Sequence, residues 1–110
     1  MVTAAVPQLT EIRTTFGLSK NELADVLHRR ASSITEWEHR GIPLDRIASV
    51  DRLVDLARVF RARVIGSRIP EIIRTPDEWL GGRSMLQTLT QEGVDPIYAY
   101  LARLFRYTGS

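Results

Sequence analysis

Apolar side chains recur every three or four residues along most of this chain, which is the spacing of one face of an α-helix. The first such segment opens at Val6-Pro7, where proline suits the first turn of a helix, and Gly17 ends it. No segment alternates apolar and polar residues for long enough to indicate a sheet. The pattern therefore predicts an all-α protein.

Two short helices joined by a tight turn follow in the predicted order. Ser19 and Glu22 have the spacing of a capping box, which marks the start of a helix that runs to about His28. After polar residues at 28–33, Ile34 and Trp37 lie three residues apart on the apolar face of the next helix. That helix is expected to stop before a glycine and a proline at 41 and 43.

The longest periodic segment spans residues 49–65, and it predicts a central helix. Its apolar stripe is wider than one core contact requires, because Leu56 and Val59 extend it. We therefore expect part of this helix to serve as a homodimer face. The residues proposed for that face are Leu53, Leu56, Val59 and Phe60.

Three further helices are predicted in the last third of the chain. Residues 75–78 (TPDE) have the pattern of a second capping box, and Gly81-Gly82 ends the short helix that it starts. Ser84 and Gln87 form a third box, and Asp95-Pro96 opens the final helix. The inner face of that final helix is expected to comprise Ile97, Leu101, Leu104 and Phe105.

Composition then narrows the class of protein. The chain has 110 residues with 44% hydrophobic and 25% charged side chains, as in one globular domain or two very small ones that share a core. The absence of cysteine excludes disulfides, thiolate zinc sites and thiol nucleophiles. A net charge of +2 argues against a polybasic, non-specific binder of nucleic acid or membranes.

No catalytic centre, metal site or cofactor is expected from the sequence. His28 and His39 lie eleven positions apart without a helical partner for a metal, and no glycine-rich phosphate loop is present. The opening ten residues are uncharged but too few to span a bilayer, and they lack the basic start of a signal peptide. We therefore expect a soluble, cytoplasmic protein that is not an enzyme.

Residues 18–24 (LSKNELA) followed by residues 34–38 (ITEWE) resemble the Xre-type helix-turn-helix of repressors and antitoxins. Geometry and resemblance together imply that the second helix lays a polar face into the major groove of operator DNA, with basic residues at the phosphates. The candidate DNA-binding residues are Lys20, Arg29, Arg30, Ala31, Ser32, Ser33, Thr35 and Arg40.

This segment departs from the Xre pattern at its turn. His28 stands where the family usually has glycine, and Glu36 and Glu38 add negative charge on or beside the candidate reading helix. The alternative interpretation of residues 1–40 is therefore a scaffold or dimerisation platform without DNA contacts.

Residues 75–89 (TPDEWLGGRSMLQTL), then Gly93 and a closing helix, resemble the C-terminal domain of MbcA/ParS/Xre antitoxins. The resemblance divides the chain into a DNA-binding and dimerisation region, residues 1–65, and a toxin-binding region, residues 66–110. It implies a RES-type toxin as partner, an NAD-degrading protein whose cleft the antitoxin blocks with C-terminal residues. The candidate toxin-binding residues are Tyr98, Arg103, Arg106, Tyr107, Thr108, Gly109 and Ser110.

Three functions remain open at this stage. The first is an antitoxin that blocks its cognate RES-type toxin and, as a homodimer or larger assembly with it, represses its own operon. The second is a stand-alone Xre-type regulator whose C-terminal helices only dimerise, and the third is an adaptor in which both regions bind protein. Tyr98 and Tyr107 can alternatively cap a small C-terminal core, and we expect Trp79 to lie in the core.

Overall fold

The computed structural model describes residues 6–107. Within this part of the chain every regular element is helical, so the predicted all-α fold is confirmed. The α-helices are α1 (Pro7–Phe16), α2 (Lys20–Leu27), α3 (Ala31–Arg40), α4 (Ile47–Arg63), α5 (Ile69–Arg74), α6 (Met85–Glu92) and α7 (Asp95–Tyr107). Three single 3-10 turns join them: η1 (Leu44–Arg46), η2 (Gly66–Arg68) and η3 (Glu78–Leu80).

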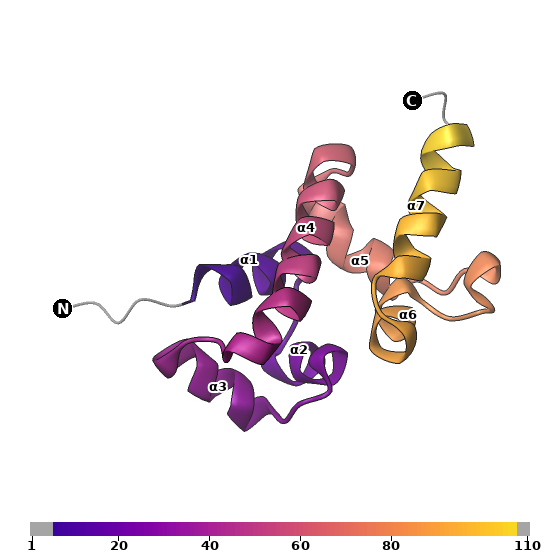
Figure 1. Ribbon diagram of the computed structural model, residues 1–110. Coiled ribbons are helices and arrows are strands. Elements are labelled where there is room, and N and C mark those ends of the chain that lie inside the picture. Colours follow the sequence, from indigo (N-terminus) through magenta and orange to yellow (C-terminus); the bar gives the residue numbers. More distant parts are fainter. Residues whose placement is uncertain (1–5, 108–110) are drawn as a thin grey trace.

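Helix α4 occupies the middle of the molecule (Figure 1). In this view α1 lies to the left of α4, α2 and α3 lie below it, and α6 and α7 lie to its right. Near the end of α4 the Arg63 guanidinium lies 4.6 Å from the ring centre of Phe105, near the end of α7. One hydrophobic core takes buried side chains from all of these helices and from α5. The predicted regions 1–65 and 66–110 therefore share a single core.

The two capping boxes predicted at serines are confirmed. At the start of α2 the Glu22 amide donates to Ser19 Oγ over 3.1 Å, and the Ser19 amide donates back to the Glu22 carboxylate over 2.9 Å. Ser84 and Gln87 make the same reciprocal pair before α6. Each box satisfies amides that the first helical turn leaves without partners.

The capping box predicted at residues 75–78 is wrong. Thr75 instead ends α5, and its hydroxyl donates to the Glu71 carbonyl over 2.8 Å. The next turn, η3, is capped by Asp77, whose carboxylate accepts from the Trp79 amide. A bridge between Asp77 and Arg83 closes the loop around η3. The Thr75 hydroxyl thus serves the end of α5, and the Asp77 carboxylate, a preferred helix cap, starts the next turn.

The sequence pattern did not predict helix α5. It is only six residues long, and Pro70 occupies its first turn. Its residues Ile69 and Ile73 are buried, and Ile72 packs partly against the core. The spacing of these isoleucines is that of one helical turn, so the signal was present but short.

The expected homodimer face on α4 requires correction. Leu53, Leu56 and Phe60 are buried within the single chain, and Val59 is half-buried against the same core. Phe60 meets Phe16 of α1 edge to face, with ring centres 5.4 Å apart. The apolar stripe is wide because α4 is central and is covered on more than one side (Figure 1), which leaves Leu53, Leu56 and Phe60 no surface for a second copy.

No helix in the described residues is long and apolar enough to cross a membrane.

Candidate functional site

Helices α2 and α3 form a compact unit with a three-residue turn. His28 ends α2 in the left-handed conformation, with φ 58°, and it lies where the Xre pattern usually has glycine. Ala24 is buried in this unit, and its carbonyl accepts from the Arg29 amide over 2.8 Å. The inner face of α3 is formed by buried Ile34 and Trp37. The small Ala24 suits the closest approach of the two helices.

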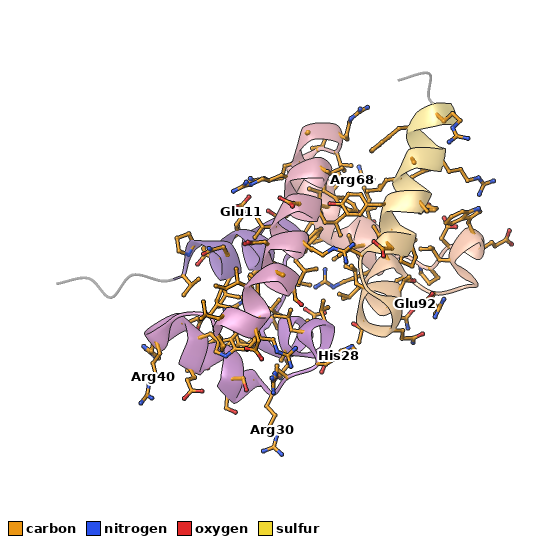
Figure 2. All side chains as sticks on the ribbon, viewed as in Figure 1. Glu11, His28, Arg30, Arg40, Arg68 and Glu92 are labelled. Carbon is orange, nitrogen blue, oxygen red and sulfur yellow. The ribbon has the colours of Figure 1, made fainter. Side chains whose placement is uncertain are left out.

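The opposite face of α3 is polar and faces away from the rest of the molecule. Arg30 and Arg40 lie at its two ends, and both side chains point away from the body (Figure 2). Arg29, Arg30, Ser32 and Arg40 are exposed, whereas Ala31, Ser33 and Thr35 are half-buried. The structure thus brings most of the candidate DNA-binding residues to one surface.

Lys20 and Thr35 of that set are already engaged with each other. Lys20 Nζ donates to Thr35 Oγ1 over 3.0 Å and pairs with the Glu38 carboxylate over 2.9 Å. Arg13 of α1 approaches the same carboxylate at 3.6 Å. Two cations therefore offset the negative charge of Glu38, and Lys20 must leave this carboxylate to reach a phosphate.

The α2–α3 turn also contacts the C-terminal half directly. His28 Nε2 lies 2.6 Å from the Thr90 carbonyl oxygen in α6, so this ring nitrogen carries the proton and donates it. Beside it lies a depression of about 230 Å³ between α2, α4 and α6, lined in part by His28, Arg46 and Arg52. Arg52 is paired with Asp95 at the start of α7. The His28 contact thus joins the turn to α6, and the Arg52 pair joins α4 to α7.

Arg74, which sequence reasoning missed, joins α5 to the connection between α1 and α2. Its guanidinium donates to the carbonyls of Phe16 and Gly17 over 3.1 and 2.8 Å, to the Pro70 carbonyl over 2.9 Å and to the Glu22 carboxylate over 2.8 Å. The pKa of Glu22 is held below its usual value, chiefly by the Ser19 amide and further by Arg74, against the opposing effect of burial.

Glycine at position 17 lets Pro70 of α5 lie close to the end of α1. Its φ is 65°, and a β-carbon there would come within 3.0 Å of the Pro70 side chain. Any other residue at position 17 would have to strain its own backbone and push α5 away.

The expected toxin-binding residues are only partly described. Tyr98 is half-buried, and Arg103 and Arg106 are exposed on α7. Only the backbone of Tyr107 is described, as the last residue of α7. The remaining candidates, Thr108, Gly109 and Ser110, lie outside the described residues.

Trp79 is not a core residue, contrary to expectation. Its side chain is 44% exposed because η3 stands out beyond α6 and α7. The indole lies against Tyr100, with ring centres 5.5 Å apart, and the Arg103 guanidinium is 5.5 Å from it. Leu104, expected on the inner face of α7, is 40% exposed. The exposed C-terminal surface therefore combines aromatic, aliphatic and basic groups.

Tyr100, which packs against Trp79, is itself held by a hydrogen bond. Its hydroxyl donates to the Asp77 carboxylate over 2.6 Å. Burial, followed by this hydrogen bond, raises the pKa of Tyr100 to about 12. The aromatic pair is thus held by the same aspartate that caps η3.

Among the described residues, no three His, Asp or Glu side chains come together as a metal site would require. No family model, no curated protein and no solved structure matches the chain.

Proposed function

We propose that this protein is an antitoxin that binds operator DNA through α2 and α3 and a RES-type toxin through its C-terminal helices. The observation that carries the proposal is the two-sided character of α3. Its inner face is buried, while its outer face is polar, projects from the body and is bounded by Arg30 and Arg40.

An α-helix such as α3 fits the major groove of DNA, which is about 12 Å wide. Ser32 lies at the N-terminal end of α3, where a recognition helix contacts base edges. Arg29, Arg30 and Arg40 provide positive charge where the phosphate backbones would run. Because Lys20 must exchange Glu38 for phosphate, it adds less to affinity than an unpaired lysine, and the salt dependence of binding is correspondingly shallow.

DNA binding is tested by replacing Arg30 and Ser32 together with alanine. We expect the variant to lose the gel shift on the promoter of its own gene while its circular dichroism stays unchanged, because both side chains are exposed. The matched control replaces Arg68 and Ser67, an exposed pair in η2, and should retain the shift. An unchanged shift in the Arg30 and Ser32 variant would show that α3 does not enter the groove.

The C-terminal surface supports the second half of the proposal. After Asp95, α7 carries Arg103 and Arg106 and no acidic residue. Arginine pairs bidentately with carboxylates, and an exposed tryptophan is a frequent anchor of protein interfaces. Trp79 beside Arg103 is therefore added to the residues expected to meet the toxin.

Co-expression with a RES-type protein encoded next to this gene tests toxin binding. We expect the intact chain to rescue growth, and the combined replacement of Trp79 and Arg106 by alanine to abolish rescue. Arg40→Ala serves as the control, because it weakens DNA binding but lies far from α7 (Figure 2). A chain that retains the gel shift but never rescues growth is instead a stand-alone regulator, and one that does neither fits the adaptor.

A further inference from the structure

The proposed function makes no use of the depression between α2, α4 and α6. Its volume is about 230 Å³, which is roughly the space of eight water molecules in the liquid. The residues that line it come from the end of α2, the first two turns of α4 and the end of α6. A small molecule in this depression would therefore touch three helices at once.

The inner wall of the depression is apolar. Its buried lining side chains are at most 6% exposed and come from all three helices: Leu27, Leu53, Leu89 and Val94. A hydrocarbon group placed on this wall would leave water, which is favourable. The wall alone would accept any small apolar molecule.

Arg46 adds a positive charge that no other described residue balances. It lies directly before α4 and is half-buried, and its side chain makes no hydrogen bond or ion pair within residues 6–107. The other half-buried arginines of that range, Arg13, Arg74 and Arg83, all donate hydrogen bonds to carbonyls and pair with carboxylates. A half-buried guanidinium is usually paired, so Arg46 is the exception that indicates a missing anion.

The remaining polar groups of the depression leave Arg46 as the main site for that anion. Arg52 is already paired with Asp95, and His28 already contacts the Thr90 carbonyl through Nε2. None of the described residues that line the depression is acidic. A ligand would thus meet one unbalanced positive charge beside an apolar wall.

We propose that this depression binds a small monocarboxylate that carries a short hydrocarbon group. The Arg46 guanidinium pairs with the carboxylate, a planar anion that matches the two parallel N–H groups of arginine. Ser49, one turn further along α4, donates its hydroxyl to the same carboxylate. The hydrocarbon group lies on Leu27, Leu53 and Leu89.

Charge favours a carboxylate over a phosphate ester. A phosphate monoester carries about two negative charges near neutral pH, whereas a carboxylate carries one. The second charge would require Arg52, which would then have to leave Asp95. A carboxylate is balanced by Arg46 alone.

Titration of the isotope-labelled full chain with benzoate, followed by NMR at constant salt and pH, tests the proposal. We expect saturable changes in the amide signals of Leu27, Ser49 and Leu89, with a Kd of about 1 mM, as is reasonable for so small a ligand. Benzamide has the same shape without the charge, and inorganic phosphate has charge without the hydrocarbon. Each should bind about tenfold more weakly than benzoate.

Two substitutions test the charge and the space separately. Arg46→Gln should weaken benzoate binding about tenfold, while Arg68→Gln, the same change at an exposed arginine in η2, should leave it unaltered. Ser49→Phe places a ring in the depression and should abolish binding. Circular dichroism should be unchanged in all three variants, because Arg46 has no partner to lose and Ser49 and Arg68 are exposed.

A ligand that binds only the folded chain also stabilises it. Benzoate well above its Kd should therefore raise the Tm of the unaltered chain and of Arg68→Gln. The Tm of Arg46→Gln should rise much less at the same concentration.

Three results would overturn the proposal: no saturable change with benzoate, a benzoate affinity that Arg46→Gln leaves intact, or phosphate binding as tight as that of benzoate. All of them concern the protein without DNA or toxin, so they are distinct from failure of the proposed function. A chain that binds benzoate through Arg46 but neither shifts promoter DNA nor rescues growth would contradict the function and leave this site intact.

Discussion

His28 combines a left-handed backbone with a hydrogen bond to the Thr90 carbonyl. Replacement by alanine removes the bond but keeps a β-carbon in the left-handed conformation, so we expect the free energy of unfolding to fall by about 1 kcal/mol. Replacement by glycine also removes the bond but relieves the backbone, and it should be nearly neutral. Urea denaturation measures both variants. Equal stability of the two would show that the turn is unstrained.

Tyr100 makes stability depend on pH in the alkaline range. Its pKa is about 12 in the folded chain and about 10 in an unfolded one. The folded state thus keeps a proton that the unfolded state loses, and the stability this contributes is full below pH 10 and lost as pH rises toward 12. Urea denaturation from pH 8 to 12 should show this decline, and Tyr100→Phe should make it shallower. An equally steep decline in the variant would assign it to other groups.

The sequence alone could predict the roles of those side chains whose partners lie a few residues away along the chain. Ser19 and Glu22 cap a helix through atoms three residues apart, so spacing alone was sufficient. Arg74 and Trp79 could not be assigned in this way. The role of Arg74 depends on carbonyls more than fifty residues earlier, and the exposure of Trp79 depends on how far η3 stands out from α6 and α7.

At the scale of elements, Arg74 ties α5 to the end of α1, in addition to the burial of Ile69 and Ile73. Replacement of Arg74 by alanine should lower the free energy of unfolding by about 2 kcal/mol, because carbonyls of Phe16 and Gly17 lose a charged donor. Lysine should recover less than half of this, since an ammonium cannot bridge the same acceptors in a plane.

Arg68→Ala is the control for the Arg74 variants. Its side chain is exposed and only approaches Glu71 at 3.6 Å, so stability should change by less than about 0.5 kcal/mol. If both arginine variants are equally stable in urea, the network around Arg74 contributes nothing specific.

Helices with clear boundaries were predictable, and the surfaces that they present were not. Periodicity and caps identified most helices, whereas α5 has six residues and no side-chain cap. Periodicity also shows that α4 is apolar on a broad side, but it does not distinguish a second intramolecular contact from a dimer face. Only the three-dimensional packing shows that Leu56 of α4 is buried and that Leu44 of η1 is exposed.

For the whole molecule, the shared core makes a specific prediction about fragments. Residues 1–65 alone would expose apolar side chains of α1 and α2 that α5 and α6 cover. We expect this fragment to lose helicity gradually on heating, while the full chain unfolds in one cooperative transition. Circular dichroism at increasing temperature measures both. A sharp transition of the fragment would show that residues 1–65 are an independent domain.

One core beneath both candidate surfaces also has a consequence for turnover in the cell. Because both halves contribute side chains to that core, we expect neither product of a protease cut between α4 and α5 to remain folded. Degradation would then leave no stable fragment able to carry either of the proposed activities. The two activities would decay with a single half-life, so synthesis and destruction of the intact chain would set the timing of both.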